Sequence, residues 1–265
     1  MDDFLTINQL AWDNRTELHL ESDFYDMPGF MAGNTSLREI ELAELDVRGK
    51  SVLHLQCHFG QDTLSWAREG AASVTGLDLS PKAIAAANQI TDTLNIEANL
   101  GVPVQFVCGN VLDARHLIEG DFDLVYASYG VLCWLPDLTA WANTIASCLK
   151  PGGLFFLAEF HPIKALLDGY DYFHTGKADV EQEGSYTENS HDAENTMVSW
   201  SHDLGQVVSA LINAGLVIES LREYDFSPYN CFENLAEEEP GRFRQRINGK
   251  PIPMVFSIKA RKPIA

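Results

Sequence analysis

The sequence predicts an α/β fold built on a doubly wound, mostly parallel sheet. Apolar segments with strand character alternate with segments of helical periodicity from residue 51 to near residue 260. The clearest unit spans residues 51–80: an apolar strand, a loop containing Gly60, a helix and a second strand. That second strand ends at Asp78, 18 positions after Gly60, close to the ~20-residue spacing that brings a carboxylate to a nucleotide ribose. Right-handed crossovers place both strand ends at one sheet edge, so we expect Asp78 to hold a nucleoside there.

The other elements of this sheet follow in order along the chain. Ser80 and Pro81 form a helix start, with serine as N-cap and proline at the first helical position. Residues 122–128 are almost wholly apolar, which is typical of a central parallel strand buried on both faces. Strands are further predicted at residues 104–110, 154–160, 216–224 and 253–261, and helices at residues 138–149 and 204–212.

Five motifs between residues 54 and 153 resemble those of the class I S-adenosylmethionine-dependent methyltransferases. That family opens its site with an acidic residue and three spaced glycines, and the matching stretch is HLQCHFG, residues 54–60, which keeps only Gly60. GLDLSP at 76–81 resembles the ribose-binding strand end, CGNVLD at 108–113 the adenine-binding turn, and FDLVYASYGVLCWLPD at 122–137 the fourth strand and its loop. LKPGG at 149–153 resembles the turn before the fifth strand. The resemblance implies a Rossmann-like sheet of seven strands with an antiparallel last strand, and S-adenosylmethionine as cofactor.

The resemblance also implies which residues hold the cofactor. His54, Gln56 and His58 replace the family's acidic residue and two glycines, and their side chains either contact the cofactor or only pack the loop. Asn110 replaces a frequent aspartate, but its amide oxygen can still accept from the adenine amino group. The full predicted set is Trp12, Tyr25, His54, Gln56, Cys57, His58, Gly60, Asp78, Leu79, Asn110, Val111, Ala127, Ser128 and Tyr129.

Two further classes of protein compete with a methyltransferase. An NAD-dependent oxidoreductase needs successive glycines so that the backbone can approach a pyrophosphate, and this loop lacks them. A binding module that senses S-adenosylmethionine or S-adenosylhomocysteine without catalysis is not excluded by any residue. The sequence therefore favours methyl transfer to a small-molecule acceptor, with the sensor as the alternative.

Two segments are expected to frame the domain at residues 49–265. Residues 1–48 form an N-terminal helical segment that in related methyltransferases lies over the cofactor as a lid. Residues 161–203 form an insertion after the fifth strand, beginning at the active-site edge of the sheet. Trp12 and Tyr25 would face the cofactor, and Tyr186 and Trp200 would wall the acceptor side. The alternative is an arm that is permanently packed on the sheet.

Catalytic side chains are assigned by their place in the chain. Methyl transfer from a sulfonium has a neutral leaving group, so positioning and exclusion of water can supply most of the catalysis. If the acceptor is a hydroxyl, His161, just past the fifth strand, is the candidate base; otherwise it hydrogen-bonds the turn before Pro162. Glu159 at the same edge would orient an amine or the cofactor, or make a structural contact.

Composition narrows the partners and the compartment. A net charge of −20 repels phosphate backbones, so we expect no nucleic-acid partner. Five cysteines without regular spacing indicate reduced thiols and no metal site. The N-terminus lacks a signal-peptide pattern, and no apolar run reaches the ~20 residues of a membrane span. A cytoplasmic enzyme, monomeric or homodimeric, is expected.

Overall fold

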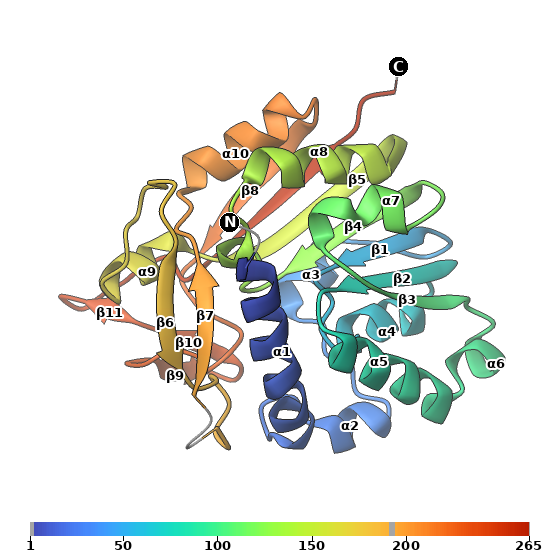
Figure 1. Cartoon of the computed structure of the whole chain (residues 1–265), viewed down its shortest axis with the longest axis horizontal. Coiled ribbons are helices and arrows are strands. Elements are labelled where there is room, and N and C mark those ends of the chain that lie inside the picture. The colour runs from blue at the N-terminus through green and yellow to red at the C-terminus, as the bar shows by residue number, and fades with distance from the viewer. Residues whose placement is uncertain (1–2, 191–193, 265) are drawn as a thin grey trace.

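The computed structural model describes residues 3–190 and 194–264, and it contains the predicted doubly wound sheet of seven strands (Figure 1). Its spatial order is β3-β2-β1-β4-β5-β13-β8. The strands are β1 (Ser51–Leu55), β2 (Ser73–Asp78), β3 (Val104–Cys108), β4 (Phe122–Ser128), β5 (Leu149–Phe160), β8 (Val217–Tyr224) and β13 (Val255–Arg261).

Strand directions decide where a site can form. β1 pairs in parallel with β2 and β4, β2 with β3, and β4 with β5. β13 runs antiparallel between β5 and β8, which confirms the antiparallel last strand. The carboxyl ends of β1 to β5 therefore share one edge of the sheet, and the loops after them can converge on one ligand.

Helices cover both faces of the sheet, and each face has its own apolar core. On one face, Trp66 and Phe156 belong to a core with residues of the neighbouring helices; on the other, Trp141 and Phe155 pack edge to face at 5.4 Å. Ser80 caps α5 as predicted, since its Oγ accepts from the Ala83 amide at 3.0 Å. The helices are α4 (Gln61–Arg68), α5 (Pro81–Leu94), α6 (Ile96–Leu100), α7 (Ala114–Leu117), α8 (Leu138–Cys148) and α10 (Leu204–Asn213), with 3-10 turns η1 (Val111–Asp113) and η2 (Leu132–Trp134).

The N-terminal segment, which was expected to be helical, contains three helices among the described residues. It forms α1 (Asp3–Glu21), α2 (Met27–Met31) and α3 (Glu39–Glu44). The side chains that α1 buries include Asn8, Arg15 and His19, so its buried stripe is largely polar. Hydrophobic periodicity cannot reveal such a helix. Figure 1 shows α1 crossing between the β6–β7 hairpin and α5.

The insertion folds as a short helix followed by a hairpin. Its elements are α9 (Pro162–Leu167), β6 (Asp179–Glu183) and β7 (Asn195–Ser199), and β6 pairs antiparallel with β7. Residues 191–193 of this insertion lie outside the described residues. The Asn8 amide pairs with the Val198 backbone through two hydrogen bonds, at 2.8 and 2.9 Å. The hairpin and α1 therefore form a joined layer over the sheet edge.

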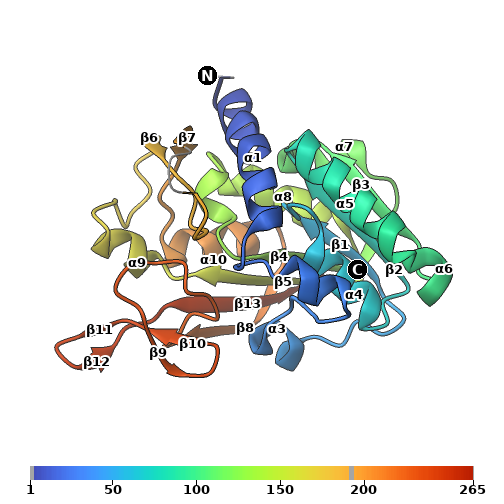
Figure 2. The ribbon, with the colours of Figure 1, turned by 90° about the horizontal axis from the view of Figure 1, so that it is seen from below.

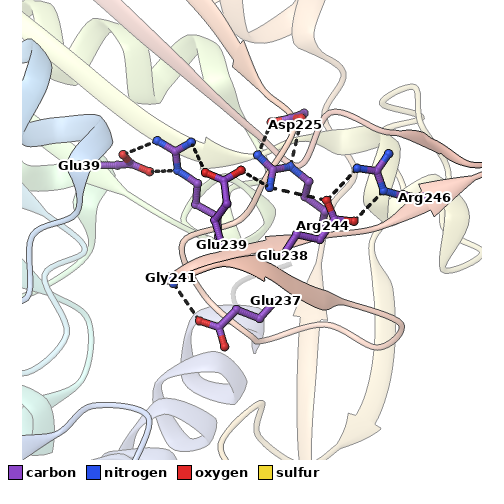
Figure 3. A network of polar contacts seen from close by, with 9 residues as sticks. Glu39, Asp225, Glu237, Glu238, Glu239, Gly241, Arg244 and Arg246 are labelled. Atoms are coloured by element: carbon purple, nitrogen blue, oxygen red, sulfur yellow. Dashed lines mark hydrogen bonds and ion pairs between the residues drawn. The ribbon is translucent and has the colours of Figure 1, made fainter.

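A second excursion, between β8 and β13, was not predicted. It contains β9 (Ala236–Glu239), β10 (Arg242–Arg244), β11 (Arg246–Ile247) and β12 (Lys250–Pro251), and it extends beyond the sheet on the side of β8 (Figure 2). Arg244 pairs with Asp225 at 3.1 Å and with Glu239 at 3.0 Å (Figure 3). Arg242 pairs with Glu39 of α3 at 2.7 Å, which ties the excursion to the N-terminal segment.

Candidate active site

A cavity of about 1090 Å³ lies at the carboxyl edge of the sheet. Its floor is the loop after β1 together with the ends of β2 and β4 and the turn after β3. Its cover comes from α1, residues 24–38, the end of the β6–β7 hairpin and residues 229–233. Segments from four parts of the chain thus enclose one space.

The loop after β1 takes a backbone shape that normally requires glycine. Gln56 and His58 have φ of 57° and 50°, in the left-handed region, at the two positions where the family has glycines. Gly60 has φ of 79°, and a Cβ there would lie 2.4 Å from Cζ of Phe106. Strain at a loop that lines a cavity is a feature of binding sites.

Three polar atoms near this loop are buried without a hydrogen-bond partner among the described residues. They are Nε2 of His54, Oε1 of Gln56 and Nδ1 of His58. The opposite ring nitrogen of His54 contacts Oγ1 of Thr63 at 2.9 Å, and the Gln56 amide donates to the Val131 carbonyl at 2.9 Å. Buried polar atoms are rarely left unsatisfied, so a ligand is expected to meet at least some of them.

Asp78 lies at the end of β2, partly buried and facing the cavity. Its Oδ2 accepts from the His58 amide at 2.7 Å, and its Oδ1 accepts from the Ser80 amide at 2.9 Å. Burial raises the pKa of Asp78 to about 6, Asp13 adds to the rise, and the two amides oppose it. Each carboxylate oxygen can accept more than one hydrogen bond, so two neighbouring hydroxyls can still be bound.

A polar corner lies at the other end of the loop. Asp62, in the first turn of α4, accepts from Ser36 at 2.6 Å and from Ser128 at 3.2 Å. Arg38 lies over the Tyr229 ring at 4.5 Å, and its Nε has no partner among the residues described. A carboxylate and a guanidinium at one corner suit a zwitterionic amino-acid group.

Behind this corner lies a fully buried acid, Glu41. Its carboxylate accepts from Tyr126 at 3.3 Å and from Tyr129 at 3.0 Å. Burial, together with the neighbouring charge of Asp62, raises the pKa of Glu41 to about 7. The glutamate therefore holds the end of β4 in place. Near neutral pH its carboxyl group is only partly ionised.

The cover is joined to the floor by a chain of polar contacts. Nδ1 of His19 contacts Nε2 of His58 at 2.8 Å, and Nε2 of His19 contacts Oγ of Ser185 at 2.6 Å. The hydroxyls of Tyr25 and Tyr186 lie 2.5 Å apart. Burial lowers the pKa of His19 to about 3 and that of His58 well below its ordinary value, so both rings are neutral at pH 7. These contacts hold the N-terminal segment, the loop and the insertion together.

Most of the predicted cofactor residues line this cavity. They are Trp12, Tyr25, His54, Gln56, Cys57, His58, Gly60, Asp78, Leu79, Asn110, Val111, Ser128 and Tyr129. Ala127 is fully buried in the sheet and contributes no surface to the described lining. Tyr186 lines the cavity, whereas Trp200 packs edge-on against Phe4 at 5.1 Å, outside the described lining.

Glu159 and His161 make contacts that shape the loop and turn beside the site, and within the described chain neither lines the cavity. The Glu159 carboxylate accepts from the amides of Val131 and Leu132, at 2.8 and 3.0 Å, and from Gly130. His161 caps α9: its Nδ1 accepts from the Ile163 amide at 3.2 Å, and its Nε2 lies 2.9 Å from Glu223. Both ring nitrogens of this histidine are thus engaged.

Several lining residues were missed by sequence reasoning. Asp62 carried a usable signal, since it occupies the first turn of the helix after the loop. No such signal marked Arg15, Arg38 or Tyr229. Each lies in a segment outside the recognised motifs, and that segment reaches the cavity only in the folded chain. Among described residues, no group of three or more His, Cys, Asp or Glu is placed to hold a metal ion, and no helix could cross a bilayer.

Residues 53–157 match the family model described as a methyltransferase domain. An uncharacterized methyltransferase of Synechocystis sp. is 32% identical over 133 residues, which cover 49% of this chain and 57% of the relative. A ubiquinone biosynthesis O-methyltransferase of Neisseria meningitidis serogroup C is 30% identical over 116 residues, covering 44% of this chain and 46% of the relative. The chain thus spans about half the length of these curated relatives.

Solved structures show the same fold over most of the chain. A SAM-dependent methyltransferase from Methanosarcina mazei superposes with a TM-score of 0.61 at 18% identity, covering 86% of this chain and 99% of that one. An S-adenosylmethionine-dependent methyltransferase from Mesorhizobium loti has a TM-score of 0.55 at 22% identity, covering 87% and 99%. The Rossmann-like sheet predicted from the motifs is therefore confirmed.

Proposed function

We propose that this chain, which belongs to the class I S-adenosylmethionine-dependent methyltransferase family, transfers a methyl group from S-adenosylmethionine to a small-molecule acceptor. The observation that carries the proposal is Asp78 at the end of β2, facing a covered cavity beside a loop with unsatisfied polar atoms. The net charge of −20 supports a small acceptor over nucleic acid. All five cysteines, each within the described residues, are free thiols, which supports the expected cytoplasmic location.

The cavity offers a partner for each part of the cofactor. Asp78 would bind the ribose hydroxyls, with Leu79 and the Asn110–Val111 turn beside the adenine. Asp62 would face the ammonium group of the methionine part, and Arg38 its carboxylate. Within the described lining, the opposite charges of the polar corner match a zwitterion better than a pyrophosphate, which needs backbone amides or several cations.

The size of the cavity is compatible with a second molecule beside the cofactor. Ligand sites usually measure ~300–1,000 Å³, and this cavity measures about 1090 Å³. A sensor needs room for the nucleoside alone, whereas a transferase needs room for a second molecule. The acceptor would occupy the side under the hairpin, near Tyr186 and Cys133.

When bound, the cofactor supplies an electrophilic methyl group on a sulfonium with a neutral leaving group. The chain's own residues then position the acceptor and exclude water. Trp12, Tyr25 and Tyr186 would form the cover, while Glu159 would hold the loop after β4 in place. We propose that His161 and Glu159 serve by positioning, since their polar atoms are engaged by backbone or by Glu223.

Calorimetry tests the proposal. S-adenosylhomocysteine should bind the chain, and NAD should not bind with comparable affinity. Absence of heat with S-adenosylhomocysteine would overturn it. Methyl transfer from labelled S-adenosylmethionine to a panel of small hydroxyl, amine and thiol compounds then separates an enzyme from a sensor.

A further inference from the structure

Arg15 is a buried cation to which no carboxylate of the described residues is directly bonded. Its side chain, on the buried face of α1, is only 3% exposed and lines the cavity. Its Nη2 donates to the Gly184 carbonyl at 2.5 Å, while its Nε has no hydrogen-bond partner among the described residues. Within the same residues, no acid lies within ion-pair distance of this guanidinium, in contrast to Arg242 and Arg244.

An isolated buried charge is costly, so this arrangement calls for an anion. A buried ion without a directly bonded counterion loses its hydration and regains only part of that free energy from more distant charges such as Glu183. The surroundings offer only partial relief: the Trp12 ring lies 5.6 Å from the guanidinium, and the Gly184 carbonyl is neutral. Burial lowers the pKa of Arg15, and Tyr186 and Glu183 oppose that shift only in part. An arginine nevertheless stays protonated at neutral pH.

Arg15 lies at the end of the cavity beneath the insertion, next to Trp12 of the cover. On the insertion side its neighbours are Glu183, Gly184 and Tyr186 of the hairpin end. The other cation of the described lining, Arg38, lies at the polar corner near Asp62 and Glu41. One guanidinium thus suits the methionine carboxylate, and Arg15 is left for a second ligand.

We propose that the methyl acceptor carries a carboxylate group that Arg15 binds. This inference rests on the proposed function and specifies the substrate class of the same site. A carboxylate at Nε would satisfy the open donor with a charge-assisted hydrogen bond. A monoanion fits better than a phosphate, because one guanidinium neutralises one charge and Glu183, also in the lining, disfavours a second.

The surrounding walls indicate what the carboxylate is attached to. Trp12, Tyr25 and Tyr186 line the same cavity as Arg15, and the Trp12 ring lies 5.6 Å from its guanidinium. Such walls favour a flat apolar body, held at one end by the carboxylate and presenting its nucleophilic atom toward the sulfonium. An aromatic or other planar carboxylic acid is the acceptor class that results.

The test uses matched acids and amides on the complex with S-adenosylhomocysteine. Benzoate, phenylacetate and 3-phenylpropionate are each compared with their primary amides by thermal shift and calorimetry, with inorganic phosphate as a further arm. At least one acid should bind, its amide at least tenfold more weakly. Arg15→Met should weaken that acid at least tenfold and leave S-adenosylhomocysteine affinity within about threefold. Arg48→Met, which removes an exposed arginine paired with Asp46, is the matched control and should change neither.

The outcomes that overturn the proposal are distinct from failure of the proposed function. The latter would appear first, as absence of S-adenosylhomocysteine binding. The carboxylate proposal is refuted if no acid binds, if amides bind equally, if phosphate binds more tightly than every acid, or if Arg15→Met binds the acid like the unmodified chain. Should Arg15→Met fail to fold because the Gly184 contact is lost, Arg15→Lys keeps a cation there. That variant should retain the melting temperature and still weaken the acid, since lysine lacks the planar fork.

Discussion

Replacement of Asp78 by asparagine is expected to weaken S-adenosylhomocysteine binding by ten- to a hundredfold. The carboxylate already accepts from the His58 and Ser80 amides, and each oxygen would add one ribose hydroxyl. Asparagine keeps one acceptor oxygen and turns an NH₂ group toward an amide donor. One charge-assisted hydrogen bond to the ligand is thereby lost, worth ~1.5–3 kcal/mol. At 1.4 kcal/mol per factor of ten, that loss gives the expected range.

Calorimetry at pH 7.5 measures this change directly, and circular dichroism checks the fold. Asp137→Asn is the matched control: Asp137 also accepts from two backbone amides, at 2.8 and 3.2 Å, but it caps α8 outside the described cavity lining. It should leave ligand affinity unchanged. If Asp78→Asn is folded and binds S-adenosylhomocysteine as tightly as the unmodified chain, Asp78 is only a cap of the strand end, and the ribose must lie elsewhere.

Four further outcomes are expected. Because the pKa of Asp78 is about 6, S-adenosylhomocysteine affinity measured by calorimetry should fall as the pH is lowered from 7 to 5. An equally steep fall in Asp78→Asn would contradict this. The ligand-free chain should respond in the opposite sense, since a raised carboxyl pKa contributes stability below about pH 4 that is lost as the pH rises through 6. Gly60→Ala should lower the free energy of unfolding by ~2–5 kcal/mol, because of left-handed backbone strain and the contact with Phe106. The control is Gly101→Ala, where φ is 68° and no atom lies within 4 Å of the added Cβ. In denaturant titrations this control should lower the free energy of unfolding by only the ~1–2 kcal/mol of backbone strain. If residues 8–30 and 165–190 form a lid, S-adenosylhomocysteine should slow their hydrogen exchange, and equal protection with and without it would identify a permanently packed arm.

The central sheet could be predicted because its signals are local. Apolar strands, the Ser80–Pro81 cap and the position of Asp78 lie within short windows of the chain, where periodicity and spacing are informative. The floor of the cavity follows from them, since parallel strands end at one edge. Of the fourteen residues predicted to hold the cofactor, all except Ala127 accordingly line the cavity.

The cover of the site could not be predicted in the same way. α1 buries Asn8, Arg15 and His19, and a polar stripe has no hydrophobic period to detect. The excursion that supplies Tyr229 has no motif, and its contact with Arg38 joins residues about 190 positions apart. Likewise, chain position suggested His161 as a base, but only the folded chain shows both of its ring nitrogens engaged.

The sequence by itself therefore determined the sheet and the edge at which the cavity lies, and it predicted the cofactor class, because neighbouring residues encode strand, turn and cap. Tertiary structure alone decided which side chains meet over that edge and which charges lack a partner. Arg15 illustrates the difference: in the sequence it is one of 18 lysines and arginines. In the fold it is a buried guanidinium facing a cavity. Burial and pairing depend on contacts between distant segments, and these contacts exist only once the chain has folded.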